Sequence, residues 1–289
     1  MNNIKLAFIG GTGLYEIEGL TNINQVCIDT PFGKTSDLIT LGRLQQETVA
    51  FLPRHGHDHQ ITPSNIPARA NIYALKTLGV ERLISINAVG SLQKNINPRD
   101  AVIPGQLIDR TYLRVNTFFD KALVAYISFA RPFCNELSTL LAKACEIHST
   151  VHRNGTMLVI EGPAFSTSAE SRLYQQWGGD VIGMTVLPEA KLAREAEMCY
   201  SSLSLVTDND AWLETDEVNV NTILSHLKSN ACKAKSIIAD LIPRLNIPRT
   251  CECQNALRDT IMTNTNSIDP SEYIRLKSII SKYSSDNNK

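Results

Sequence analysis

The segment Cys199-Tyr-Ser-Ser-Leu-Ser-Leu-Val206 runs directly into Thr207-Asp208-Asn209-Asp210-Ala211-Trp212. Its first part predicts a buried strand, and its second part places two carboxylates two residues apart where that strand ends. Because side chains at i and i+2 of a strand share a face, we expect Asp208 and Asp210 to meet one ligand edge together. Neighbouring carboxylates repel, so one of them tends to keep its proton. A donating carboxyl beside an accepting one matches the edge of an adenine ring, although an Asp-x-Asp also suits a solvated loop.

The composition excludes several classes of protein. The chain has 289 residues, of which 43% are hydrophobic, so it can bury a large core as one α/β domain or two small ones. Its formal net charge is -1 and it contains no basic run. Nucleic-acid binding and attraction to an anionic membrane both need clustered positive charge, so we expect neither.

The termini and the cysteines indicate a cytoplasmic protein. The apolar stretch Leu6 to Ile9 is interrupted by Gly10 and Gly11, and is too short for a signal peptide or a membrane span. The seven cysteines are odd in number and mostly lie in apolar surroundings, which favours reduced thiols. Only Cys251-Glu-Cys253 suggests metal or redox chemistry. It lacks the second pair that zinc needs, so we interpret it as structural, with a local disulfide as the alternative.

Apolar runs alternate with helical patterns along the chain, which predicts an α/β fold with a mixed or largely parallel central sheet flanked by helices. The predicted strands are Ile4 to Ile9, Gln25 to Asp29, Asp37 to Leu41, Thr48 to Leu52, Arg82 to Ala88, Met157 to Ile160, Val181 to Met184 and Cys199 to Val206. The predicted helices are Ile66 to Leu78, Cys134 to His148, Pro188 to Met198, Glu217 to Leu241 and Ser271 to Tyr283. No internal repeat is present. We predict one domain over residues 1–246, with residues 247–289 forming a connector, a helix and a polar tail on or beside it.

The first predicted strand ends in Gly10-Gly11-Thr12-Gly13. Glycines at a strand end let backbone N–H groups approach an anion closely. A dinucleotide fingerprint would need a further glycine where this chain has Glu16, and a Walker loop would need Gly-Lys-Ser/Thr. The remaining interpretations are a small anion site with the Thr12 hydroxyl as donor, or simply a tight turn.

The densest group of ionisable residues is Arg54-His55-Gly56-His57-Asp58-His59. Alternating histidines could bind a metal, but no further motif with ligand spacing completes such a site, so we expect no metal there. A guanidinium and an imidazole at a strand end suit an oxyanion better, because Arg54 can bind phosphate in bidentate fashion. Two anion-directed segments make free phosphate a natural ligand.

Together these segments resemble a known family, the trimeric purine nucleoside phosphorylases, and most of all its branch that cleaves S-methyl-5'-thioadenosine. The resemblance covers roughly residues 4–245 and rests on motifs that occur in the family's order. These motifs are Gly10-Gly11-Thr12-Gly13-Leu14, Asp29-Thr30-Pro31-Phe32-Gly33-Lys34, Arg54-His55-Gly56, Ala88-Val89-Gly90-Ser91-Leu92, Ile108-Asp109-Arg110-Thr111, Glu161-Gly162-Pro163-Ala164-Phe165-Ser166, Ala169-Glu170-Ser171, Gly183-Met184-Thr185, Pro188-Glu189 and Thr207-Asp208-Asn209-Asp210.

The resemblance implies a single-domain phosphorylase fold, a homotrimer or a dimer of trimers with sites near subunit boundaries, and neither a metal nor an organic cofactor. It assigns the phosphate shell to Thr12, Arg54, His55, Asn87, the backbone of Ala88 and Thr185. Met184 would lie along the ribose and Phe165 against the purine. The base would be read by the segment Asp208-Asn209-Asp210. Ser166, Val220 and Tyr126 would shape specificity around the base and the 5' substituent.

The predicted chemistry follows from charge development. As the N-glycosidic bond stretches, the ribose becomes cationic and the purine gains negative charge, so phosphate stabilises the sugar while a protonated Asp208 neutralises N7. An ionised Asp210 would accept from the 6-amino group. A 6-oxopurine would present an acceptor there instead, at a cost of about 1 to 3 kcal/mol or more.

Three residues depart from the branch pattern. Asn87 is more like the 6-oxopurine branch, although it can still donate to phosphate. Tyr126 stands where relatives carry a histidine from the neighbouring subunit, and Gly183 replaces a residue with a side chain. Two alternatives therefore stay open: a purine nucleoside phosphorylase acting on inosine, guanosine or adenosine, and a nucleoside sensor without turnover.

Overall fold

A computed structural model describes residues 4–11, 16–213, 220–264 and 268–283. Its centre is a nine-stranded mixed sheet with strand order β2-β3-β4-β1-β5-β8-β7-β6-β9. The strands are β1 (Leu6–Gly10), β2 (Leu20–Val26), β3 (Ile39–Leu44), β4 (Glu47–Pro53), β5 (Arg82–Ser91), β6 (Ala101–Arg110), β7 (Val151–Ile160), β8 (Val181–Gly183) and β9 (Cys199–Asp208).

The sheet closes on itself in its second half. Strand β9 pairs in parallel with β5 and in antiparallel fashion with β6, while β8 joins β5 to β7. The pairings β5-β8-β7-β6-β9-β5 thus form a closed circuit, and β1 to β4 extend from it as an open wing. The carboxyl ends of the parallel strands β5 and β9 therefore lie side by side.

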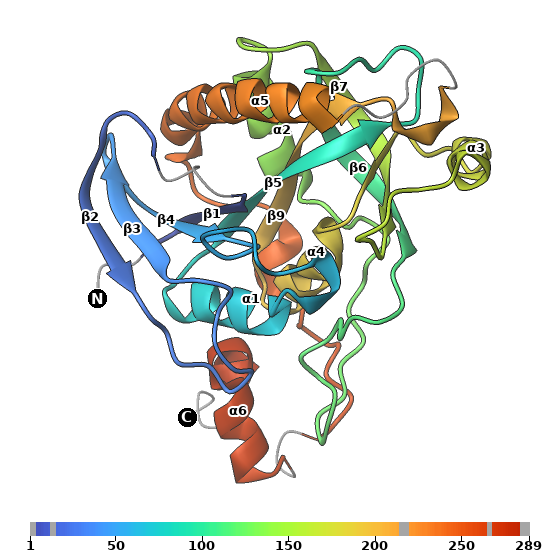
Figure 1. Cartoon of the computed structure of the whole chain (residues 1–289). Helices are drawn as coiled ribbons and strands as arrows, with labels where there is room; N and C mark the ends of the chain where they lie inside the picture. The colour runs from blue at the N-terminus through green and yellow to red at the C-terminus, as the bar shows by residue number, and fades with distance from the viewer. Residues whose placement is uncertain (1–3, 12–15, 214–219, 265–267, 284–289) are drawn as a thin grey trace.

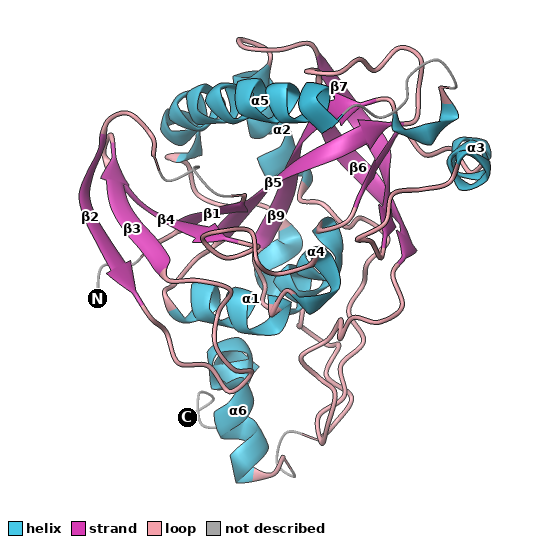
Figure 2. Ribbon diagram, in the orientation of Figure 1, coloured by secondary structure: helices cyan, strands magenta, loops and turns pink. Residues whose placement is uncertain are grey.

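Helices cover both faces of the sheet (Figure 1). The helices are α1 (Ala68–Thr77), α2 (Asn135–Cys145), α3 (Ser168–Gln176), α4 (Val186–Glu195), α5 (Val220–Leu241) and α6 (Pro270–Ile280). Figure 2 shows α2 and α5 over one face and α1, α4 and α6 over the other. Contacts between α2 and α5, and of α1 with α4 and α6, agree with this arrangement.

The core explains why the central strands are apolar on both sides. Along β1, Ala7 and Ile9 belong to one buried cluster, whereas Leu6 and Phe8 belong to another on the opposite face. Successive side chains of a strand point to opposite faces, so a strand covered by helices on both faces needs a continuous apolar run. The alternation of apolar runs with helical patterns therefore predicts the fold class correctly.

One predicted strand differs from the structure, and one strand and one helix of the structure have no predicted counterpart. The predicted strand Gln25 to Asp29 is wrong in its bounds, because β2 runs over Leu20–Val26 with largely exposed side chains and carries no alternating apolar signal. Strand β6 and helix α3 were not predicted. Pro104 and Gly105 interrupt β6, where the pairing with β7 shifts register, and both residues mask a strand signal.

The C-terminal segment contributes to the core. Leu276, Ile279 and Ile280 of α6 are buried in the same cluster as α1, and α6 contacts α1. The boundary near residue 246 between a domain and an appended segment stays a prediction. Within the described ranges, no helix has the length and apolar character that crossing a membrane requires.

Candidate active site

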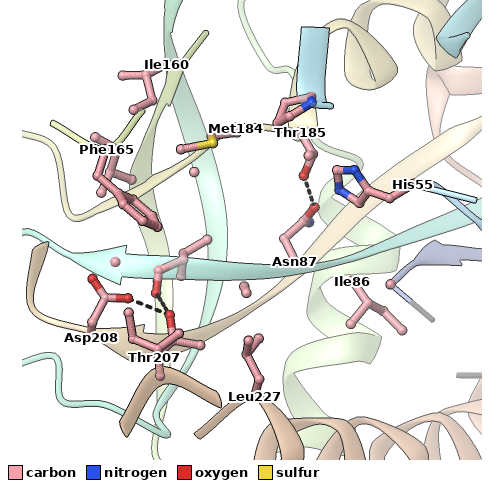
Figure 3. Close-up of a pocket in the computed structure, with 18 of the residues that line it drawn as sticks. His55, Ile86, Asn87, Ile160, Phe165, Met184, Thr185, Thr207, Asp208 and Leu227 are labelled. Carbon is pink, nitrogen blue, oxygen red and sulfur yellow. Dashed lines mark hydrogen bonds between the residues drawn. The ribbon is translucent and has the colours of Figure 1, made fainter. Parts of the chain in front are cut away.

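A cavity of about 290 Å³ opens at the carboxyl ends of β5 and β9, beside β8. Residues from seven regions of the chain line it, namely Gly11, Arg54, His55, His59, Pro63, Ile86, Asn87, Ala88, Val89, Gly90, Ile160, Phe165, Ile182, Gly183, Met184, Thr185, Thr207, Asp208, Asp210, Ile223 and Leu227. Figure 3 shows Asp208 and Thr207 on one side of the cavity, and Asn87, Thr185 and His55 on the other. Ligands in α/β proteins commonly bind at this edge of the sheet.

Asp208 is the last residue of β9 and is held in place by its neighbours. The Thr207 hydroxyl lies 2.6 Å from Oδ1, and the Asp210 amide donates to Oδ2 over 3.1 Å. The position of the carboxyl is therefore fixed before any ligand binds.

The backbone element that places Asp210 in the cavity differs from the predicted one. Strand β9 ends at Asp208, and Asp210 begins a short 3-10 turn with a φ of 44°. Strand alternation therefore does not bring the two carboxylates together, and the turn that follows the strand does. Asp210 is 5% exposed, and its Oδ2 is buried with no hydrogen-bond partner among the described residues. Burial raises the pKa of Asp210 above its usual range.

Gly90 makes room for both carboxylates. It lies opposite Asp208 in the pairing of β5 with β9. A Cβ at this position would come within 3.1 Å of Asp208 Oδ2 and within 3.3 Å of the Asp210 Cβ. A side chain at this position would therefore push the acidic pair by a few tenths of an ångström, and glycine avoids that shift.

Arg54 lies at the other end of the cavity and is 2% exposed. Its Nε and Nη2 donate to the two carboxylate oxygens of Glu189. Nη2 also donates to Ser85 Oγ and the Ile9 carbonyl, and Nη1 donates to the Ile86 carbonyl. The bidentate edge expected to hold phosphate thus already holds Glu189. Only an Nη1 hydrogen has no partner among the described residues. A role for Arg54 in binding phosphate stays a prediction, and it would involve a single hydrogen bond or act through the field of the ion pair.

Asn87 and Thr185 form a second polar pair at this end. The Thr185 hydroxyl donates to Asn87 Oδ1 over 2.7 Å, and Asn87 Nδ2 donates to Ser202 Oγ over 2.8 Å. Figure 3 shows the first of these bonds across the cavity wall. The Asn87 side chain is therefore oriented by the protein and positions Thr185.

His55 is neutral at physiological pH. Burial is the main cause that lowers its pKa to about 4. Its Nδ1 lies 2.7 Å from the Ile61 carbonyl, which requires a proton on that nitrogen. The Nε2 of the neutral ring is then an acceptor, suited to a protonated phosphate oxygen or a hydroxyl.

Apolar residues connect the two polar ends. Figure 3 shows Met184 and Phe165 above the middle of the cavity and Leu227 of α5 below it. Phe165 is 65% exposed although it lines the cavity. Met184 packs over Gly162, where a Cβ would come 2.5 Å from the sulfur, and Gly162 has a φ of 67°. This wall suits an uncharged, partly apolar middle section of a ligand.

Of the other predicted site residues, three do not line the described cavity, and two cannot be placed within it because their side chains fall outside the described part of the chain. Thr12 and the side chain of Val220 lie outside the described residues. Ser166 and Asn209 do not line the cavity, although the buried Oγ of Ser166 has no partner in the described part of the chain. Tyr126 is 72% exposed, and its amide donates to the Thr260 carbonyl, so it contributes nothing to the cavity of its own chain.

Other residues that support the site were missed by the sequence analysis. Glu189 was quoted in a motif without a role, yet it neutralises Arg54 and accepts from Tyr200 Oη over 3.0 Å. Arg114 donates to the carbonyls of Met184 and Leu187 and pairs with Glu161 over 2.8 Å, which fixes the segment carrying Met184. The partners of Arg54 and Arg114 are 47 to 135 residues away in the chain, so spacing gives no signal for them.

The described part of the cavity presents no group of residues arranged to hold a metal ion. Among the described residues, a metal-ligand cluster occurs only at Cys134, Cys199, Cys251 and Cys253, which do not line it.

Comparisons with known proteins identify the family of the chain. Residues 5–243 match the model of the phosphorylase superfamily. The S-methyl-5'-thioadenosine phosphorylase of Geobacter sulfurreducens is 49% identical over 281 residues, which cover 96% of this chain and 98% of that protein. The crystal structure of a methylthioadenosine phosphorylase from an antarctic soil metagenomic library superposes with a TM-score of 0.93 at 44% identity, covering 96% of this chain and 99% of that one.

A more distant structure binds a nucleoside. A variant of the adenosine/methylthioadenosine phosphorylase of Schistosoma mansoni, in complex with methylthioadenosine, superposes with a TM-score of 0.83 at 31% identity, covering 90% of this chain and 99% of that one. The chain therefore belongs to the S-methyl-5'-thioadenosine phosphorylases of the phosphorylase superfamily. The predicted family, fold class and pentosyltransferase class of enzyme are confirmed.

Proposed function

We propose that this enzyme cleaves S-methyl-5'-thioadenosine with inorganic phosphate, giving adenine and 5-methylthioribose 1-phosphate. One observation carries the proposal: a largely apolar cavity has, at one end, a buried carboxylate oxygen without a partner among the described residues, and at the other a polar, pre-arranged group. The names of the relatives support the same substrate.

The base binds at the acidic end in this proposal. The unpartnered Oδ2 of Asp210 is an acceptor inside a buried site, and leaving such an acceptor unpaired costs about 1 to 3 kcal/mol. The 6-amino group of adenine supplies the missing donor, whereas the carbonyl oxygen of hypoxanthine does not. Burial raises the pKa of Asp210, and a hydrogen bond donated to its carboxylate by the 6-amino group would lower that pKa by stabilising the charged form.

Phosphate binds at the other end, near His55, Asn87, Ala88 and Thr185, and acts as co-substrate. A phosphate oxygen attacks C1' as the bond from C1' to N9 breaks, and the bonding electron pair moves into the purine ring. The Asp208 carboxyl gives its proton to N7, so adenine leaves neutral and Asp208 regains a proton from solvent. The fixed position of Asp208 supports its role as the donor, because proton transfer needs hydrogen-bond reach.

The 5' substituent faces the apolar side of the cavity. Ile223 and Leu227 of α5 line this part of the wall, and both side chains favour a methylthio group over a hydroxyl. A methyl-sized gain in apolar burial contributes roughly 1 kcal/mol, so we expect a moderate preference.

A panel of nucleosides tests the substrate. Methylthioadenosine, adenosine, inosine and guanosine are incubated with and without phosphate, and the released base and the sugar phosphate are quantified. We expect phosphate-dependent release of adenine, with kcat/KM for methylthioadenosine above that for inosine by about 10- to 100-fold or more. Comparable cleavage of inosine would favour a 6-oxopurine phosphorylase, and binding without cleavage would favour a nucleoside sensor.

We also propose a homotrimer in which each subunit contributes Tyr126 to its neighbour's site. The exposure of Tyr126 outside its own cavity supports this arrangement. Light scattering should give the mass of three 32.0 kDa chains, or of six for a dimer of trimers. If the chain is a monomer of full activity, Tyr126 has no such role.

We propose a cytoplasmic location on the basis of the cysteines. All seven are free thiols, and three of them are buried within one group of sulfur atoms. Reduced thiols are typical of a reducing compartment. Fractionation of cells with an antibody against the native protein tests this placement.

A further inference from the structure

Four cysteines from three separate segments meet at one place in the fold. Cys134 caps the start of α2, Cys199 begins β9, and Cys251 and Cys253 belong to the connector that follows α5. Their four sulfur atoms all lie within 4.8 Å of one another. We call Cys134, Cys199, Cys251 and Cys253 the four-cysteine cluster. It corrects the expectation that Cys251-Glu-Cys253 lacks a second pair.

We propose that the four-cysteine cluster binds one structural zinc ion through four thiolates. Tetrahedral coordination with Zn–S bonds of about 2.3 Å places the sulfurs about 3.8 Å apart. The observed separations extend from 3.3 Å, between Cys199 and Cys251, to no more than 4.8 Å. Small side-chain adjustments therefore produce the coordination geometry of a single ion.

The sulfurs are not arranged as disulfides. The Cys199 and Cys251 sulfurs are separated by 3.3 Å, whereas a disulfide bond is about 2.05 Å long. All four cysteines are free thiols. Zinc also accounts for the convergence of all four sulfurs, since binding replaces four thiol protons by one ion, and the protons leave to solvent.

The surroundings indicate a structural role. Three members of the four-cysteine cluster are buried and Cys251 is partly buried, so the coordination sphere is closed and leaves no position for a substrate. The cluster lies at the first residue of β9 and the candidate catalytic Asp208 at the last. With about 3.3 Å per residue, the two sites are roughly 30 Å apart.

The ion would fasten the connector to the sheet and to α2. Other contacts already join the same segments: the Cys134 amide donates to the Tyr200 carbonyl, and the Thr250 amide and hydroxyl donate to Glu136 over 3.0 and 2.6 Å. These bonds hold Cys134 beside β9 and position Cys251 next to α2. The connector leads to α6, whose apolar face completes the core against α1.

Metal analysis of the full chain, purified without an affinity tag and without added metal, tests the proposal. We expect elemental mass spectrometry to find about one zinc ion per chain. Cys253→Ser should lose the zinc, whereas Cys145→Ser, a buried cysteine of α2 outside the four-cysteine cluster, should keep it. A chelator should lower the melting temperature of the wild type but not that of Cys253→Ser. Phosphorolysis at 25 °C should change little in either variant.

Two results would overturn the proposal. One is a wild-type chain without zinc whose intact mass, under denaturing and non-reducing conditions, is lighter by two hydrogen atoms for each disulfide. The other is a fully reduced, metal-free chain that takes up neither zinc nor cobalt. Should Cys253→Ser fail to fold, cobalt substitution of the wild type decides the question, because four thiolates give an intense sulfur-to-cobalt charge-transfer band.

Discussion

The two ends of the cavity differ in whether their polar side chains have hydrogen-bond partners within the protein. At the phosphate end, the side chains satisfy one another: Arg54 pairs with Glu189, and Thr185 donates to Asn87. At the base end, Asp210 keeps a buried oxygen without a partner in the described residues. The contrast indicates that protein contacts pre-arrange the end proposed for phosphate, while the end proposed for the base leaves a buried acceptor available to a ligand. Four experiments test this difference between the two ends.

The largest effect is expected at Asp208, the proposed proton donor. Asp208→Ala removes general acid catalysis, which contributes about 10²- to 10⁴-fold, so kcat should fall by that factor with a smaller change in KM. Asp208→Asn is the matched control, because its amide can donate a hydrogen bond to N7 without giving up a proton. Steady-state assays should rank wild type above Asn and Asn above Ala; equal kcat in all three would remove Asp208 from the chemistry.

The phosphate end depends on the buried ion pair. Glu189→Ala leaves the Arg54 guanidinium buried without its carboxylate, which should cost about 3 to 5 kcal/mol of unfolding free energy in urea denaturation. The double variant Glu189→Ala with Arg54→Met removes both charges and should recover part of that loss. If the single and double variants are equally destabilised, the two groups are not coupled.

The base end is tested by Asp210→Asn. An amide can both donate and accept, so the ratio of inosine to adenosine kcat/KM should rise by about 10- to 100-fold, or about 1 to 3 kcal/mol. Phosphate KM should stay close to that of the wild type, because Asp210 lies at the other end of the cavity. An unchanged ratio would count against this assignment.

The smallest effect concerns His55, whose pKa is lowered to about 4. The unfolded chain binds more protons than the folded one between about pH 6.5 and 4, so stability is full above pH 6.5 and falls as the pH drops through that window. His55→Gln should lose less stability there, by roughly 1 to 2 kcal/mol after allowance for solvent screening. Unfolding curves at pH 7 and pH 4.5 measure the difference, and parallel losses in both proteins would contradict the lowered pKa.

Local sequence patterns predicted most of the elements but failed where a local rule was broken. The polar side chains of β2, and Pro104 and Gly105 in β6, obscure the local sequence signal for these two strands. The strands still form, because β3 pairs with β2 and β7 pairs with β6. The sequence does contain a local signal for the start of helix α3, because Thr167 and Glu170 form a capping box there. The pattern Thr-x-x-Glu before a helical segment would have found it.

The candidate site divides in the same way. Six of the predicted site residues line the cavity, namely Asp208, Asp210, Arg54, His55, Asn87 and Thr185. Their individual roles stay predictions. Neither Glu189 as the partner of Arg54 nor the 3-10 turn at Asp210 followed from spacing.

The α/β class, the family and the chemical character of both ends of the cavity can be predicted from the amino-acid sequence alone. Each of these is encoded locally, in apolar periodicity and in short motifs at strand ends. The pairing of Glu189 with Arg54 and the convergence of four cysteines become visible only in the folded chain. The contacts between Cys199 and Cys251 and between Arg54 and Glu189 join residues 52 and 135 positions apart, and their formation depends on the order and register of the strands that carry them.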